Sequence, residues 1–205
     1  MNLWALVPLK PFHAAKTRLR TVLNDQERME MSKALFQKTM SVLEQVDGIT
    51  GIAVVSAEQV EYQTVNKRYI WIDEGGAYGL NAALNLATLS LQAAGAEGVL
   101  IIPADLPLLD QAALSEIISQ ASKGGCMAIA PDRRRDGTNA LLVSPPGLIT
   151  YFFGAHSFAR HVMAAQKVSL EPRIVENEIL ALDLDIPDDL AMLQKTISVP
   201  AFSPT

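Results

Sequence analysis

Apolar residues in this chain form short uninterrupted runs, and longer stretches with apolar residues at helical spacing lie between these runs. Short apolar runs that are rich in β-branched residues and bounded by Gly or Pro predict strands buried on both faces, as in a parallel sheet. The stretches with helical spacing predict amphipathic helices that cover such a sheet. The pattern as a whole therefore predicts an α/β fold.

The order of these elements follows directly from the pattern. The expected strands are 3–9, 51–55, 68–72, 99–102, 127–130, the strand entered at 137–139, and 180–190. The expected helices are a long one capped by Asn24 or Asp25 that runs to about Val46, 56–66, one that begins at Leu80, 110–122, one entered through 154–160, and one with Pro187 in its first turn.

The chain is organised around the run 98–109, GVLIIPADLPLL, whose apolar part predicts the central strand. Asp105 follows directly, between two prolines. Ligands of open α/β sheets bind outside the carboxyl ends of the strands, so Asp105 is well placed to hold a metal ion or a ribose. The alternative is that Asp105 only caps the next helix. Asp110 is the better cap, because it immediately precedes the periodic run AALSEIIS.

A second carboxylate pair, Asp183 and Asp185, lies on one face of the predicted strand 180–190. Two carboxylates at this spacing are costly unless a cation lies between them. The pair therefore predicts a second part of a metal site.

Composition narrows the possible functions. The chain has 205 residues, of which 49% are hydrophobic and 19% charged, as in globular proteins. Its formal net charge of -5 argues against general nucleic-acid binding, so a phosphate-rich ligand would need local cations or metal ions. Cys126 is the single cysteine, which excludes an intrachain disulfide.

The sequence has no signal-like or membrane-spanning segment, so a cytoplasmic location is expected. One domain over 1–197 and a loosely ordered tail over 198–205 are expected.

Cations gather in the loop after the first predicted strand, among them Lys10, Lys16 and Arg18. This is where α/β folds commonly bind phosphate. The loop lacks the glycines of a Rossmann or Walker motif, so those two motifs are excluded. A solvated basic loop is the alternative. Further along, Asn81 at the start of a predicted helix could contact a sugar or base, or could simply cap the helix.

Two later segments combine charge with small residues. Residues 132–139 read DRRRDGTN and place three arginines in a turn, although the chain has few cations. Residues 154–160 read GAHSFAR and put Ser157 in the first turn of a helix, a position suited to anion binding. His156 and His161 are interpreted as structural residues.

Taken together, these motifs resemble the guanylyltransferases that make the guanylylated precursor of the deazaflavin coenzyme F420. The resemblance covers nearly the whole chain. Its more general motifs are shared with nucleotide-sugar and molybdenum-cofactor transferases, whereas DGTN with GAHSF is more specific. Where the wider superfamily has a glycine-rich loop, this sequence has HAAKTRL, as this family does. The motifs are VPLKPFHAAKTRL, GLNAAL, IIPADLPLL, APDRRRDGTNALL, FGAHSFARH and DLDIPDDL.

The resemblance implies a single-domain, nucleotidyltransferase-like fold (Rossmann-like, GT-A type) with a mixed, mostly parallel sheet flanked by helices. It implies transfer of GMP from GTP to the phosphate of a small phosphorylated carboxylic acid, with pyrophosphate released. The alternatives are a transferase acting on a sugar phosphate or molybdenum cofactor, and a non-catalytic nucleotide-binding module. The acceptor (2-phospho-L-lactate, phosphoenolpyruvate or 3-phospho-D-glycerate) and the oligomeric state, including a homodimer, remain open.

The resemblance also implies roles for individual residues. The expected cofactor is Mg2+, and neither a nucleic acid nor a membrane is an expected partner. The expected catalytic residues are Lys16, Arg18 and Asp105. The expected nucleotide-binding residues are Lys10, Lys16, Arg18, Glu74, Gly79 and Asn81, the expected acceptor-binding residues are Thr138, Gly154 and Ser157, and the expected metal ligands are Asp105 with Asp183 or Asp185.

Overall fold

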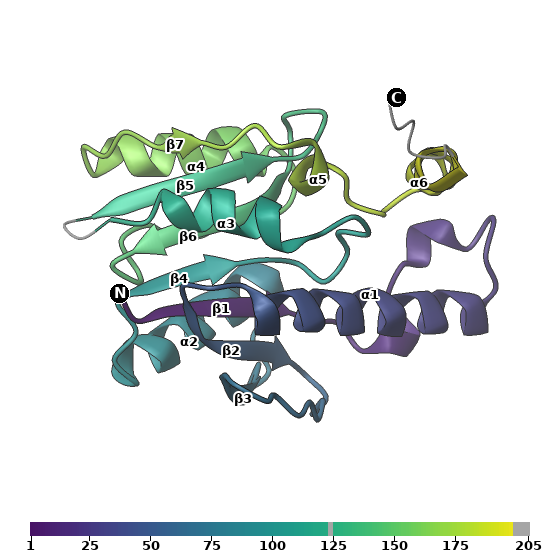
Figure 1. Ribbon diagram of the computed structural model, residues 1–205, viewed down its shortest axis with the longest axis horizontal. Coiled ribbons are helices and arrows are strands. Elements are labelled where there is room, and N and C mark those ends of the chain that lie inside the picture. Colours follow the sequence, from purple (N-terminus) through teal and green to yellow (C-terminus); the bar gives the residue numbers. More distant parts are fainter. Residues whose placement is uncertain (123–124, 199–205) are drawn as a thin grey trace, which may run out of the picture.

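A seven-stranded sheet forms the centre of the structure, a computed structural model that describes residues 1–122 and 125–198 (Figure 1). The strand order is β3-β2-β1-β4-β6-β5-β7. β6 runs antiparallel to both its neighbours, and every other pair is parallel. The prediction of a mixed, mostly parallel sheet is therefore confirmed. The strands are β1 (Leu3–Pro8), β2 (Ile49–Ser56), β3 (Arg68–Asp73), β4 (Gly98–Ile101), β5 (Cys126–Pro131), β6 (Thr138–Ser144) and β7 (Arg173–Ile174).

Helices cover both faces of this sheet, α1 and α3 on one face and α2 and α4 on the other (Figure 1). The caps expected from the sequence are present. Asn24 forms a capping box with Glu27 at the start of α1, and the Asp110 side chain accepts a hydrogen bond from the Ala113 backbone N–H in α3. The helices are α1 (Asp25–Gln45), α2 (Leu80–Ala93), α3 (Gln111–Ser119), α4 (Ser157–Lys167), α5 (Glu178–Ala181) and α6 (Pro187–Ser198), with 3-10 turns at Phe12–Ala14 and Thr17–Leu19.

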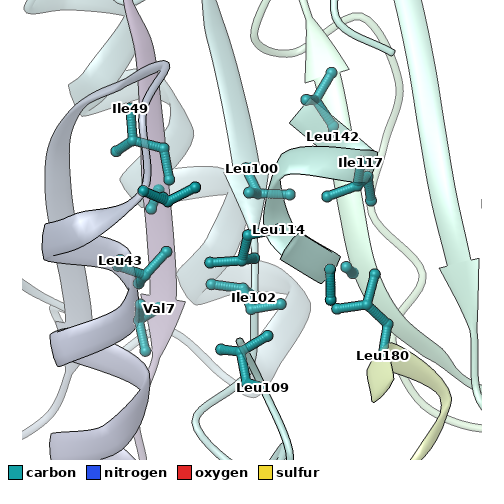
Figure 2. Close-up of a cluster of buried hydrophobic side chains, with 14 of the residues drawn as sticks. Val7, Leu43, Ile49, Leu100, Ile102, Leu109, Leu114, Ile117, Leu142 and Leu180 are labelled. Carbon is teal, nitrogen blue, oxygen red and sulfur yellow. The ribbon is translucent and has the colours of Figure 1, made fainter. Parts of the chain in front are cut away.

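Alternate residues of each central strand enter two separate cores. In β4, Leu100 packs towards α1 and α3, and Val99 and Ile101 pack towards the opposite face. Figure 2 shows Leu100 near Leu114 of α3, with Leu43 of α1 on the same side of the sheet. This two-sided burial is why the β4 run is continuously apolar.

β4 is the middle strand of the sheet, and the chain leaves its carboxyl end through 102–104 to reach Asp105. The Asp105 backbone carbonyl accepts a hydrogen bond from the Leu184 N–H at 3.0 Å. This bond brings the second acidic segment beside the first, as the sequence interpretation requires.

The prediction of a helix over 56–66 is wrong. β2 continues to Ser56, and residues 57–67 form no helix. Their backbone is held by long-range contacts: the Glu44 carboxylate accepts hydrogen bonds from the N–H groups of Val65 and Asn66, at 2.9 and 2.6 Å. These long-range contacts use backbone N–H groups that a helix would need, so they prevail over the helical spacing.

The prediction of a strand over 180–190 is also wrong. Residues 178–181 form the short helix α5, and residues 182–185 form no strand or helix. The alternating pattern has another cause, since Leu184 is buried in a cluster with Leu35 of α1 and with Leu19, which ends the second 3-10 turn. Asp183 and Asp185 nevertheless reach the cavity described below.

Two further predictions concern the chain as a whole. The expected loose tail, 198–205, lies outside the described residues except for Ser198, which ends α6. No helix in the described ranges is both long and apolar enough to cross a membrane.

Candidate active site

Two adjoining cavities open where β1 and β4 end. The larger cavity, about 520 Å³, extends towards β6 and the start of α4. The smaller cavity, about 450 Å³, extends towards the start of α2. Both are lined by Pro8, Lys10, Leu80, Pro103, Asp105 and Asp185. The two cavities therefore form one cleft with two compartments, which meet at Asp105 and Asp185, the carboxylates expected from the sequence.

The two compartments divide the expected site residues between them. The larger cavity is lined by Arg18, Thr138, Gly154, Ser157 and Asp183, and the smaller by Lys16, Glu74 and Gly79. The structure thus brings together side chains from loops far apart in the sequence. Of the expected nucleotide-binding residues, Lys10 lines both cavities, Arg18 lines the larger one and Asn81 lines neither, whereas all three expected acceptor-binding residues line the larger cavity.

Asn81 has a different environment. Its Oδ1 accepts from the Phe153 N–H at 2.7 Å, and its Nδ2 donates to the Phe153 carbonyl at 2.9 Å. The side chain therefore ties α2 to the loop that leads to Gly154. This arrangement does not support the expected nucleotide contact of Asn81. The alternative, a helix cap, is not observed either, because the N-cap residue of α2 is Gly79.

Lys16 lies between two of the carboxylates. Its Nζ is 2.9 Å from Asp105 Oδ2 and 3.3 Å from Asp185 Oδ1. The Lys16 backbone is left-handed, with φ of 55°, and the following 3-10 turn carries Arg18 to within 3.4 Å of Asp185 Oδ2. Burial opposes the charge of Lys16, but attraction to the two carboxylates outweighs burial and raises the lysine pKa.

The carboxylates also repel one another. Burial, followed by the negative charges of Asp105 and Asp185, raises the pKa of Asp183 to about 6. Asp105 Oδ1 is buried and has no hydrogen-bond partner among the described residues. Excess negative charge and an unpaired carboxylate oxygen are the conditions under which a bound cation would be stabilising.

In the described part of the chain, no three His, Cys, Asp or Glu side chains converge closely enough to enclose a metal ion by themselves. A site that uses one or two carboxylates and leaves the remaining positions to water and substrate phosphates is compatible with this spacing, and it is how Mg2+ is usually held. The arrangement therefore resembles an open metal site more than a closed structural one.

Asp183→Asn is expected to stabilise the metal-free protein above about pH 6 and to change its stability little near pH 4. The folded pKa of about 6 lies above the reference value of 3.8, so the contribution of this carboxyl to stability is complete at low pH and is lost as the pH rises through 6. Thermal unfolding in EDTA across this range measures the effect. A variant less stable than the wild type at pH 7 would contradict it. Asp188→Asn, at an exposed position of α6, is the matched control.

Sequence reasoning missed the residues that hold the acidic segment in place. Asn139 Nδ2 donates to the carbonyls of Leu180 and Ala181, at 2.9 and 3.2 Å. Asp189 Oδ2 accepts from the N–H groups of Asp185 and Ile186, both at 2.9 Å. An acidic residue at the third position of a helix was an available signal, because such residues bond back to the N-cap N–H.

Arg133, the first of the three consecutive arginines, completes this arrangement. Its Nη2 lies 2.5 Å from Asp189 Oδ1. Arg135 instead pairs with Glu176 and lies over the Phe158 ring, 5.0 Å from its centroid. Arg134 lines the larger cavity and forms no hydrogen bond or ion pair within the described ranges. Of the three, Arg134 is therefore the one available to a ligand in that cavity.

Asp189→Ala is expected to lower the free energy of unfolding by about 2–3 kcal/mol, because two backbone N–H groups and Arg133 lose a buried partner. Turnover should fall as well, since the Asp185 N–H is one of the two groups released. Urea unfolding and steady-state rates measure the two effects. Asp188→Ala, its exposed neighbour, should change neither. An Asp189→Ala protein as stable as the wild type would show that these contacts do not hold the segment.

Comparison with known proteins identifies relatives over nearly the whole chain. A family model described as guanylyl transferase CofC like matches residues 3–195. The chain is 34% identical over 194 residues to the phosphoenolpyruvate guanylyltransferase of Rubrobacter xylanophilus, covering 95% of this chain and 94% of that protein. It is 28% identical over 190 residues to the 2-phospho-L-lactate guanylyltransferase of a Methanocaldococcus species, covering 90% and 78%.

Among solved structures, a putative nucleotide-diphospho-sugar transferase from Desulfovibrio desulfuricans has a similar fold. The TM-score is 0.77 at 15% sequence identity, and the match covers 98% of this chain and 90% of that one. At this identity the likeness concerns the fold alone. It confirms the nucleotidyltransferase-like fold expected from the sequence.

Proposed function

Because the chain belongs to the guanylyl transferase CofC-like family, we propose that it transfers GMP from GTP to the phosphate of a small phosphorylated carboxylic acid. The observation that carries this proposal is the meeting of two cavities at Asp105 and Asp185, with Lys16 between these carboxylates. A nucleotidyl transfer needs two anionic substrates to meet at one point, and the cleft provides two compartments with a charged junction.

In this proposal GTP lies in the smaller cavity and the acceptor in the larger one. Lys10 and Lys16, with Arg18 close by, face the triphosphate, and Glu74 and Gly79 line the nucleoside end. Thr138, Gly154 and Ser157 surround the phospho-acid. Gly154 has φ of 116°, a backbone conformation that other residues rarely adopt, so the turn of this loop favours glycine for conformation rather than for space.

The reaction requires little covalent chemistry from the protein. An acceptor phosphate has a second pKa of about 6, so near neutral pH its oxygen attacks without a general base. A new bond forms from this oxygen to the α-phosphorus of GTP, and the bond from the α-phosphorus to the bridging oxygen breaks. Pyrophosphate leaves with the electron pair. The protein's part is to align the two phosphates and to offset their charge.

We propose Mg2+ as the metal, held by Asp105 together with Asp183 or Asp185. The unpaired Asp105 Oδ1 and the raised pKa of Asp183 both fit a cation at this position. When bound, the ion would supply positive charge to the converging phosphates. Lys16 would contribute its ammonium group to the same junction, since its Nζ contacts both Asp105 and Asp185.

For the acceptor we propose phosphoenolpyruvate, on the path to the deazaflavin coenzyme. The support is that the relative with 34% identity carries this substrate in its name, and the relative named for 2-phospho-L-lactate is 28% identical. The candidate acids differ by little beyond a methyl, a double bond or a hydroxyl, so discrimination of about 1–3 kcal/mol can depend on one contact.

The deciding experiment measures pyrophosphate release with GTP and Mg2+, run separately with phosphoenolpyruvate, 2-phospho-L-lactate and 3-phospho-D-glycerate, with the product mass confirmed. Release with phosphoenolpyruvate supports the full proposal, and release with another acid changes only the acceptor. Parallel reactions use CTP or UTP with sugar phosphates. Turnover in those reactions, with none from GTP and the three acids, would show that the chain has the fold but a different reaction.

A further inference from the structure

A chain of hydrogen bonds below the larger cavity has a fixed direction. It begins at the backbone N–H of Phe152, which donates to His161 Nε2 at 2.9 Å. Because this ring nitrogen accepts a hydrogen bond, it carries no proton, and the single proton of the neutral imidazole lies on Nδ1. His161 is fully buried, so water does not compete for either nitrogen.

The second step concerns Thr138. His161 Nδ1 lies 3.1 Å from Thr138 Oγ1 and, carrying the proton, donates to it. Ser157 Oγ also donates to Thr138 Oγ1, at 3.1 Å. A hydroxyl oxygen accepts two hydrogen bonds and donates one. Both accepting positions of Thr138 are therefore filled, and its own proton remains to be donated.

Thr138 lines the larger cavity, and its hydroxyl proton has no acceptor among the described residues. This donor is therefore available to a ligand that enters the larger cavity. A phosphate or carboxylate at neutral pH presents mainly oxygens that accept. The Thr138 hydroxyl can therefore donate to an oxyanion of the ligand. It cannot accept from a ligand N–H or O–H group at this point.

The surroundings of His161 keep the ring neutral. The rings of Phe152 and Phe153 flank it, with centroids at 6.3 and 4.9 Å. Arg160, which lies over the Phe152 ring, is the charged group nearby. Burial, followed by the charge of Arg160, lowers the pKa of His161 to about 4. Protonation would also place a proton on Nε2, where it would repel the Phe152 N–H that donates to this nitrogen.

We propose that His161 is a positioning residue that makes Thr138 an obligate hydrogen-bond donor to an oxyanion of the acceptor. That the ligand is the acceptor rests on the function proposed above, whereas the direction of the hydrogen bonds rests on the geometry alone. Ser157 supports the same arrangement, because its hydroxyl donates a hydrogen bond to Thr138 Oγ1.

The first test observes the tautomer directly. Nitrogen-15 NMR of the three histidine side chains, from about pH 5 to 8, distinguishes a protonated Nδ1 from a protonated Nε2. His13→Gln and His156→Gln variants, both at exposed positions, identify the remaining signal as His161. We expect a neutral ring with the proton on Nδ1 that does not titrate. A proton on Nε2, or titration near pH 6.5, overturns the proposal.

The second test separates positioning from general stability. The amide of His161→Asn can place its NH₂ where Nδ1 lies, whereas that of His161→Gln extends to the Nε2 position and leaves Thr138 without this donor. We expect His161→Gln to raise KM for the acceptor by about tenfold or more and to leave KM for GTP unchanged. His161→Asn should keep the KM for the acceptor close to the wild-type value.

Thr138→Val removes the hydroxyl itself and supplies the reference effect. Combining it with His161→Gln should add little, because both changes act on one hydrogen bond. Additive effects, or equal changes in both KM values, overturn the proposal. If no acid supports turnover in the wild type, the proposed function is wrong, and the NMR result alone then decides whether His161 directs the Thr138 proton.

Discussion

Asp105→Asn is expected to lower the rate of guanylyl transfer by about 10³-fold or more at saturating substrates, a loss of about 4 kcal/mol of transition-state stabilisation. Asp105 lies where both cavities meet and contacts Lys16, and its Oδ1 is buried without a partner in the described ranges. The amide has nearly the same shape but no charge. It therefore removes the carboxylate as a metal ligand without opening a cavity.

The fold should survive this change. The contact that Asp105 makes with the acidic segment uses its backbone carbonyl, which accepts from the Leu184 N–H and is retained in the variant. Loss of the charge also relieves the repulsion felt by Asp183. The variant loses the Asp105–Lys16 ion pair, but Lys16 keeps its contact with Asp185. These effects oppose one another, so we expect an unfolding midpoint close to that of the wild type in EDTA.

Asp188→Asn provides the matched control, since it makes the same chemical change at an exposed position of α6. It should have wild-type activity. Pyrophosphate release and thermal unfolding are measured on both variants. If the rate of the Asp105→Asn enzyme is within about tenfold of the wild-type rate, Asp105 is not an essential metal ligand. The ligands would then have to be sought in the second acidic segment, at Asp183 and Asp185.

The sequence was most informative where one local pattern determined both structure and position. The apolar run of β4 predicts a strand buried on both faces, and a general rule of α/β sheets then places Asp105 at the ligand-binding edge. The same reasoning placed Lys16 and Arg18 after β1. The structure adds that Lys16 reaches two carboxylates, 89 and 169 residues away along the chain.

Periodicity misled where burial had a cause other than regular structure. The alternation around Leu182 and Leu184 resembles a strand, yet both leucines are buried in a segment that forms no strand. The helical spacing of 56–66 is similarly overridden, because Glu44 of α1 takes the backbone N–H groups that a helix would have used. Both errors reflect tertiary contacts that a local window cannot contain.

The supporting residues were missed for a related reason. Arg133 and Asp189 are 56 residues apart, and Asn139 reaches Leu180 across 41. Each is individually an ordinary polar residue in the sequence. Their importance appears only when the fold sets them against the loop that carries Asp183 and Asp185. The family resemblance pointed to the residues that face the cavities, but it did not identify those that hold them in place.

Lys16→Gln is expected to lower kcat/KM for GTP by about 10²- to 10³-fold, and Arg18→Gln by about tenfold or less. Both side chains contact Asp185, but the Lys16 side chain is 9% exposed and that of Arg18 is 73% exposed. Solvent and salt screen the exposed arginine far more than the buried lysine. The Arg18→Gln loss should therefore shrink as salt is added, and the Lys16→Gln loss should largely persist.

The metal-free stability of the two variants separates charge from other effects. Without Lys16, Asp105 and Asp185 lose their close cation, so the Lys16→Gln protein should unfold at a lower temperature in EDTA and regain more stability than the wild type when Mg2+ is added. Arg18→Gln should show little of either effect. Lys16→Arg should not restore activity, because a planar guanidinium does not fit a position built for a compact ammonium group. Equal losses for Lys16→Gln and Arg18→Gln at every salt concentration would show that burial between the carboxylates is not what makes Lys16 important.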